Sequence, residues 1–200
     1  DLVDSKTPSP FHDIRVRKAV DQAIEREIIC EKVLFGATEP WGDVISPLTA
    51  GYDPSLKPPA YDPEGAKKLL AEAGYPDGFQ TEINTPPDNP FVDAVVASLD
   101  DIGIQVKINK YEAGAFFQAY FQKKLRGLVP FAGWYGAEVS APADLSDMYL
   151  RESAHCYHTT DEIDALIKKG YYAQTDKELA KYGRELSRKI RESRITVMLW

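Results

Sequence analysis

Apolar residues near the start of the chain recur at the spacing of an α-helix. Charged residues fall mostly between them, so one face of this segment is apolar and the other is polar. The helix is predicted to begin after Asp13, and its apolar face consists of Val16, Ala19, Val20, Ala23 and Ile24. A second helical stretch covers residues 26–35 and ends at Gly36.

A proline-rich stretch, residues 38–63, follows these helices. Its prolines exclude any long regular element, so we predict an ordered loop that wraps around the domain. The next helix has a clear start, because Asp62 can cap it and Pro63 occupies the first helical position. Gly74 is the residue at which this helix is predicted to stop.

The middle of the chain alternates between strand and helix patterns. Period-two alternation predicts strands at residues 79–83 and 104–108, and Asn89 with the following proline opens a helix between them. Aromatic residues at helical spacing predict a helix at 116–121. The apolar segment at 128–134 that follows it is predicted to be a further strand. Such alternation is typical of an α/β sheet.

Two capping boxes predict the helices of the last third. Thr159 with Glu162, and Thr175 with Glu178, place a threonine and a glutamate three residues apart, so that each side chain can satisfy a backbone donor. After the second helix, residues 195–200 are apolar apart from Thr196 and are predicted to begin a buried strand.

Composition favours one soluble globular domain. The 200 residues are 44% apolar, and 24 basic against 31 acidic residues give a net charge of −7. The chain has no dense stripe of basic residues, and its net charge is negative. Both observations argue against a nucleic-acid or anionic-lipid partner. No run approaches the roughly 18 apolar residues that span a bilayer, and the opening residues lack the blocks of a secretion signal. Cys30 and Cys156 leave the compartment undecided, because one long-range disulfide and two buried thiols are both possible.

Catalytic and metal motifs have little support. No GxSxG, HExxH, Walker A or GxGxxG pattern occurs, so we expect no enzyme activity and no cofactor. His155, Cys156 and His158 lie within four residues, but no second pair stands at zinc-site distance. A solvated loop is the favoured interpretation of these three residues, with a metal site as its alternative.

Four stretches together carry a family resemblance, namely PFHDIRVRKAVDQAIEREII, GYDPSLKPPAYDPEGAKKLLAEAGYPDGF, FAGWYGAEVSAPADLSDMYL and TTDEIDALIKKG. They resemble the family 5 extracellular solute-binding proteins, which include dipeptide, oligopeptide and nickel receptors. The resemblance implies an α/β fold with a mixed sheet flanked by helices, one lobe of a two-lobed periplasmic-binding-protein fold. Residues 1–200 would be the carboxy-terminal lobe, with the partner lobe and hinge outside the chain.

The resemblance also implies a function. The protein would capture a peptide or peptide-like small molecule between two lobes and deliver it to the membrane subunits of an ABC importer. Alternatives are a receptor for a non-peptide solute, such as a nickel chelate or a sugar, and a secreted chaperone or chemoreceptor binding module. The resemblance implies a periplasmic location, or a secreted, membrane-anchored lipoprotein. We expect a monomer.

The resemblance places candidate ligand-binding residues in the loop after the apolar segment. Trp134 would pack on the ligand, Glu138 would pair with a ligand ammonium, and Tyr135 lies between them. A loop at a strand end is a suitable ligand wall, because the sheet holds side chains that face the crevice. A core tryptophan and a solvated glutamate remain the alternative.

Two departures from the peptide receptors suggest a less basic cleft. Peptide receptors of this family often have a basic residue three positions before the tryptophan, and this chain has Phe131 there. They also often have a tryptophan directly after the acid that corresponds to Glu112, and this chain has Ala113 there. A carboxylate clamp is therefore not evident. Arg126 can supply one, since a guanidinium matches a carboxylate bidentately, but capping of a turn is the favoured role.

Overall fold

The computed structural model describes residues 7–130 and 141–199, with side chains in the second range from Leu145 onward. Its internal contacts divide the described residues into two compact units. The first comprises residues 7–40 and 59–130 together with Leu199, and the second comprises residues 41–58 and 141–198. No helix in these ranges is long and apolar enough to cross a membrane.

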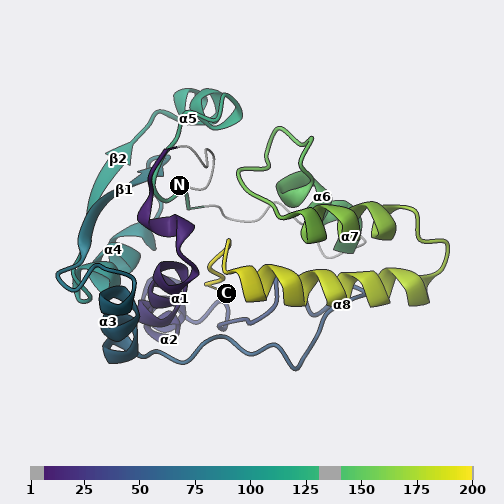
Figure 1. Cartoon of the computed structure of the whole chain (residues 1–200), viewed down its shortest axis with the longest axis horizontal. Coiled ribbons are helices and arrows are strands. Elements are labelled where there is room, and N and C mark those ends of the chain that lie inside the picture. Colours follow the sequence, from purple (N-terminus) through teal and green to yellow (C-terminus); the bar gives the residue numbers. More distant parts are fainter. Residues whose placement is uncertain (1–6, 131–140, 200) are drawn as a thin grey trace. The chain divides into compact units, whose positions relative to one another are not determined.

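The first unit combines helices with a small sheet (Figure 1). Its elements in chain order are the 3-10 turn η1 (Pro10–His12), α1 (Ile14–Ala23), α2 (Arg26–Ile28), the π-helical turn η2 (Ile29–Val33), α3 (Pro63–Glu72), β1 (Phe79–Thr85), α4 (Val92–Asp100), β2 (Ile104–Lys110) and α5 (Ala113–Phe121). The helix-strand alternation predicted from the sequence is confirmed.

The predicted helix signals at Asp13, Asp62 and Gly74 are present, whereas α4 begins at Val92 after Phe91 and Asn89 does not cap it. The Asp13 carboxylate accepts a hydrogen bond from the Arg15 amide at 2.8 Å, and the Asp62 carboxylate accepts one from the Gly65 amide at 2.8 Å. Gly74 follows the end of α3 with φ +96°, a left-handed conformation that favours glycine. Local sequence therefore sets the start of α1 and both ends of α3.

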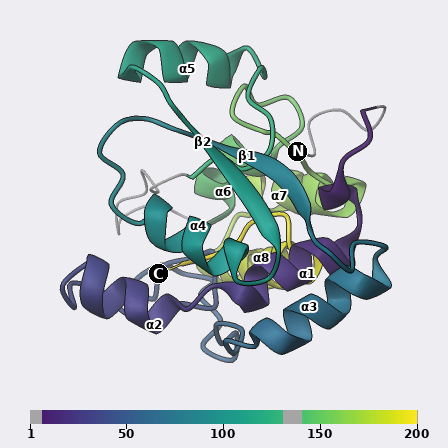
Figure 2. The same cartoon turned by 90° about the vertical axis from the view of Figure 1, so that its left-hand side faces the viewer.

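The two strands of the sheet lie side by side and are parallel (Figure 2), and the residues on its two faces differ. β1 and β2 pair in register from Phe79 opposite Ile104 to Thr85 opposite Lys110, and α4 connects them. Because side chains alternate across a strand, Ile83 and Ile104 lie on a common face, and both are buried. The opposite face carries the polar residues Gln80, Glu82, Asn84, Gln105, Lys107 and Asn109.

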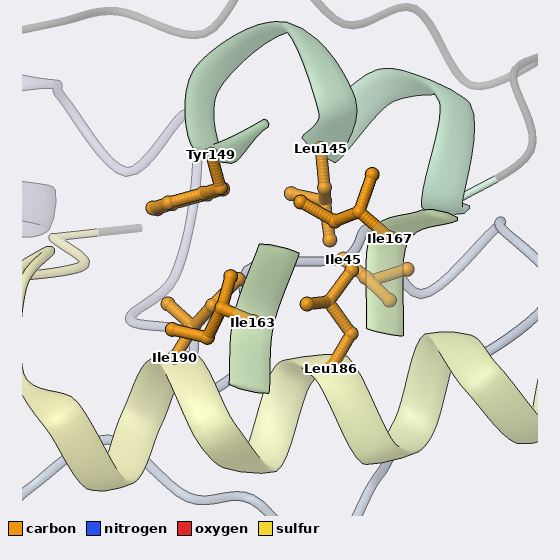
Figure 3. Close-up of a cluster of buried hydrophobic side chains, with 7 residues drawn as sticks. All are labelled: Ile45, Leu145, Tyr149, Ile163, Ile167, Leu186 and Ile190. Atoms are coloured by element: carbon orange, nitrogen blue, oxygen red, sulfur yellow. The ribbon is translucent and has the colours of Figure 1, made fainter. Parts of the chain in front are cut away.

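The second unit consists of α6 (Ala141–Tyr149), α7 (Asp161–Tyr171) and α8 (Asp176–Ser193) with the loop 41–58. Its core is an apolar cluster to which the loop and all three helices contribute (Figure 3), formed by Ile45, Leu145, Tyr149, Ile163, Ile167, Leu186 and Ile190. Burial of these side chains is the main favourable contribution to this unit's stability.

The loop 41–58 is ordered, as predicted, and a buried carboxylate holds it. Asp43 accepts hydrogen bonds from the Ile45 amide at 3.0 Å, the Asp53 amide at 2.7 Å and the Ser187 hydroxyl of α8 at 2.5 Å. Burial raises the pKa of Asp43, and these three donors oppose that shift. The loop is thereby fixed to α8.

The first capping box was misplaced by one residue. The cap of α7 is Thr160, whose hydroxyl accepts from the Ile163 amide at 3.2 Å, so the predicted pairing of Thr159 with Glu162 is wrong. Glu162 forms an ion pair with Lys189 instead. Either of two consecutive threonines can serve as a cap, and the sequence alone does not separate them.

The second capping box, at the start of α8, is confirmed. The Glu178 amide donates to the Thr175 hydroxyl at 3.2 Å, and the Glu178 carboxylate accepts from the Gln174 amide at 3.0 Å. The first bond satisfies a backbone donor of the first helical turn, and the second satisfies the amide of the residue before the cap.

The strand predicted for residues 195–200 is absent from the described part, Ile195–Leu199. α8 ends at Ser193. Arg194 follows it as the C-cap with a left-handed φ of +52°, and Ile195 then packs against the apolar cluster. A 2.5 Å hydrogen bond joins Thr196 to the hydroxyl of Tyr149, whose pKa burial raises to about 12. Ile195 and Thr196 thus make side-chain contacts within the second unit instead of pairing in a sheet.

Candidate functional site

Three stretches of chain end at the same edge of the sheet in the first unit. β1 and β2 end at Thr85 and Lys110, and Leu128 pairs with Ile83 in the parallel direction. In parallel α/β sheets, ligands bind outside the carboxyl ends of the strands. We define the carboxyl edge as residues 85–91, 110–115 and 128–130.

Backbone hydrogen bonds attach the third stretch, residues 128–130, to β1. The Leu128 amide donates to the Glu82 carbonyl at 2.8 Å, and the Asn84 amide donates to the Leu128 carbonyl at 2.9 Å. Of the predicted strand 128–134, Leu128 forms an isolated β-bridge, and residues 129 and 130 are not in a strand. The remainder of that predicted strand lies outside the described residues.

Gly127 makes this close approach possible. Its φ is +67°, and a Cβ built on it would lie 2.1 Å from the Glu82 carbonyl oxygen. No heavy-atom contact of that kind is tolerated, so a side chain here would displace the chain from β1.

Asn84 links all three stretches from the polar face of the sheet. Its side chain is fully buried, and its amide nitrogen donates to the Arg126 carbonyl at 2.5 Å. Its amide oxygen accepts from the Asn109 amide at 3.1 Å and from the Tyr111 hydroxyl at 3.2 Å. A buried amide with these partners incurs little desolvation penalty and fixes the strand ends relative to each other.

Glu82 and Tyr111 complete this polar network. The Glu82 carboxylate accepts from the Asn109 amide nitrogen at 2.9 Å. The Tyr111 backbone amide donates to the Thr85 carbonyl at 3.0 Å, and its ring lies edge-on to Phe116 with centroids 6.3 Å apart. Tyr111 is thus fixed at both its backbone and its ring.

The first turn of α5, at the carboxyl edge, is exposed and carries only small residues. Glu112 precedes the helix without making a side-chain capping bond, and Ala113, Gly114 and Ala115 are all exposed. A Cβ on Gly114 would meet no atom within 4 Å. This surface can therefore accommodate a bulky group.

Of the predicted ligand-binding residues, the structure places Ala113 at the carboxyl edge. Phe131, Trp134, Tyr135 and Glu138 lie outside the described residues.

Arg126 caps a turn, as favoured from the sequence. Its guanidinium donates to the carbonyls of Lys123 at 2.8 Å and Leu125 at 3.1 Å.

The network residues Asn84, Asn109 and Tyr111 were not among the predicted site residues. A signal for two of them exists in the sequence, because Glu82 and Asn84 alternate with apolar residues just as Lys107 and Asn109 do. That alternation assigns them to one polar face, but only the strand register shows that they meet.

Metal-ligating and nucleophilic groups are dispersed in the part of the chain that is described. There, no three His, Cys, Asp or Glu side chains gather closely enough to hold one metal ion. His155 contacts Asp147 at 2.6 Å within the second unit. Cys30 and Cys156 are buried thiols, and burial raises the pKa of Cys30.

Solved structures place this fold among periplasmic binding proteins. The ABC transporter-associated periplasmic binding protein DppA from Helicobacter pylori, in complex with the peptide STSA, matches with a TM-score of 0.88 and 27% identity, over 96% of this chain and 39% of that one. HbpA2 from Haemophilus parasuis shares the fold with a TM-score of 0.84 at 22% identity, over 98% of this chain and 40% of that one. The fold is thus that of part of a periplasmic binding protein.

Sequence comparison identifies the family. Residues 5–154 match the bacterial extracellular solute-binding proteins, family 5 (middle part), and the chain belongs to this family. It is 28% identical over 185 residues to heme-binding protein A of Haemophilus influenzae, covering 86% of this chain and 34% of that protein. It is 30% identical over 154 residues to the glutathione-binding protein GsiB of Escherichia coli K12, covering 74% and 30%. The chain spans about a third of the length of these relatives.

The close approach at Gly127 gives a prediction with a matched control. Gly36 has a similar φ of +71°, but a Cβ there would meet nothing within 4 Å. Gly36→Ala should lower the free energy of unfolding by about 1–2 kcal/mol, the cost of left-handed backbone alone. Gly127→Ala should cost roughly 1–3 kcal/mol more, because the backbone oxygen of Glu82 must move. Urea unfolding measures both, and equal costs would contradict the close approach.

Proposed function

We propose that this chain is part of a receptor that captures a peptide or peptide-like solute and delivers it to an ABC importer. The observation that carries this proposal is the likeness, at 27% identity and a TM-score of 0.88, to an ABC transporter-associated binding protein in complex with a peptide. The open carboxyl edge supports it, because ligands of parallel α/β sheets bind at such edges. The family consists of binding proteins, and we propose no catalytic step.

The carboxyl edge is the proposed ligand wall of this chain. Ala113 begins the exposed first turn of α5 there. Phe131, Trp134, Tyr135 and Glu138 follow Leu128 in the sequence, soon after the third stretch reaches this edge. We propose that Trp134 packs on the solute and that Glu138 pairs with a cationic group when the solute carries one.

Residues 1–200 are proposed to form one carboxy-terminal lobe, with both compact units belonging to it. The structural matches cover 96–98% of this chain but only 39–40% of their own chains, which supports a partner lobe supplying the rest of the site. We propose that the receptor is a monomer. Its proposed location is the periplasm, or the outside of the cell as a secreted, membrane-anchored lipoprotein. No nucleic acid or resident cofactor is part of the proposal.

A non-peptide solute is the second candidate, and one relative favours it specifically. That relative is a heme-binding protein at 28% identity. Heme is bulky, and the exposed first turn of α5 leaves room for it. The glutathione-binding relative, at 30% identity, supports a peptide-like solute instead.

The experiment that tests the function is calorimetry on the full-length receptor with a defined panel: the peptide STSA, the dipeptide Met-Leu, glutathione and heme. We expect saturable micromolar binding of STSA or another peptide, corresponding to about −8 kcal/mol. Residues 1–200 alone should bind it with a Kd on the order of millimolar, because half of the contacts are missing. Absence of saturable binding across the panel, or chemical turnover of a bound solute, would contradict the proposal.

Trp134 and Glu138 should contribute differently to affinity. Trp134→Ala should weaken binding about thirtyfold, or about 2 kcal/mol, whatever the solute's charge. Glu138→Gln should cost about 1.5–3 kcal/mol for a peptide with a free ammonium and nothing for its N-acetylated form. Thermal unfolding is the control. If both variants bind like wild type and only Trp134→Ala unfolds early, this loop is scaffold.

A further inference from the structure

The orientation of the Asn84 side chain follows from its partners. The Arg126 carbonyl oxygen, 2.5 Å away, can only accept a hydrogen bond, so the Asn84 nitrogen must face it. The Asn84 oxygen therefore faces Asn109 and Tyr111. An oxygen of this kind only accepts, so the Tyr111 hydroxyl, 3.2 Å away, must donate its proton to Asn84.

This assignment leaves the Tyr111 hydroxyl with acceptor capacity alone. A phenol has one proton and two lone pairs, and the proton is already used. Tyr111 is half-buried and stands between the end of β2 and the start of α5, within the carboxyl edge. The Tyr111 hydroxyl oxygen can therefore accept a further hydrogen bond but cannot donate one.

Two neighbouring carboxylates add further hydrogen-bond acceptors near Tyr111. Glu82 lies in the same network, bonded to Asn109, and Glu112 is the exposed residue that follows Tyr111. Both side chains are acceptors when ionised. Together with the Tyr111 oxygen, these acceptors favour a solute group that carries N–H bonds, such as a peptide amide or an ammonium.

The Tyr111 side chain is also held in advance of binding. Its backbone amide is bonded to Thr85 and its ring contacts Phe116, so little conformational freedom remains to be lost when a solute binds. A pre-oriented acceptor discriminates more sharply than a mobile one, because it cannot rotate to suit a solute without a donor.

We propose that Tyr111 contacts the bound solute as a hydrogen-bond acceptor for an N–H group, and that Asn84 is the residue that positions it. This inference rests on the proposed function and names a contact of the same site. It also gives the buried Asn84 amide a role in recognition in addition to joining the strand ends.

The test compares Tyr111→Phe with wild type in the full-length receptor, using the peptide STSA and calorimetry. Removing the hydroxyl should weaken STSA binding about three- to tenfold, as expected for one hydrogen bond between neutral groups. Tyr75→Phe is the matched control, since Tyr75 lies at the amino end of β1 with its ring 5.1 Å from that of Phe79. It should leave the affinity for STSA unchanged.

Asn84 is tested by a double-mutant cycle. Asn84→Ala should weaken STSA binding in the wild-type background and add no further loss of affinity in the Tyr111→Phe background, if it acts through Tyr111. A residue needed only for folding would lower the melting temperature in both backgrounds and leave this coupling at zero. Should Asn84→Ala fail to fold, Tyr111→Phe alone decides the contact.

The outcomes separate the two claims. If wild type binds STSA and Tyr111→Phe binds it equally well, the Tyr111 contact is overturned while the proposed function stands. If wild type binds neither STSA nor any other member of the panel, the proposed function is overturned and the contact with it.

Discussion

Parallel pairing is the constraint on which the candidate site depends. β1 pairs with β2 along its whole length and with Leu128 on its other side, so three consecutive stretches of chain end at one edge. The loop after each stretch then begins at that edge, which is why distant parts of the sequence can contribute to one surface. Gly127 permits the third stretch to approach, because any side chain there would meet the Glu82 carbonyl.

The unlike faces of the sheet explain how a buried polar network can exist there. One face carries apolar residues that join the core, whereas the other carries amides and charged groups. Asn84 is fully buried on the polar face, where an amide without partners would cost about 1–3 kcal/mol. Its bonds to Arg126, Asn109 and Tyr111 remove that cost and hold the edge in one arrangement.

Much of the fold could be predicted because its signals are local. The cap at Asp13, the Asp62-Pro63 start and the Gly74 stop each depend on a few adjacent residues, and the period-two alternation of β1 and β2 depends on the strand alone. The predictions failed where two local solutions compete or where a long-range contact decides. Thr160 replaced Thr159 as a cap, and Thr196 bonds Tyr149 instead of entering a sheet. The Asn84 network could not be predicted, because it depends on the register of β1 against β2. That register is not encoded in either strand alone.

Hydrogen–deuterium exchange of the full-length receptor, with and without the peptide STSA, tests most directly whether the carboxyl edge is the ligand wall. We predict that STSA slows exchange of the amides at residues 111–115, where β2 gives way to α5, and leaves residues 75–79 at the amino end of β1 unchanged. Protection of residues 75–79 with no change at residues 111–115 would place the solute at the opposite edge and contradict the account.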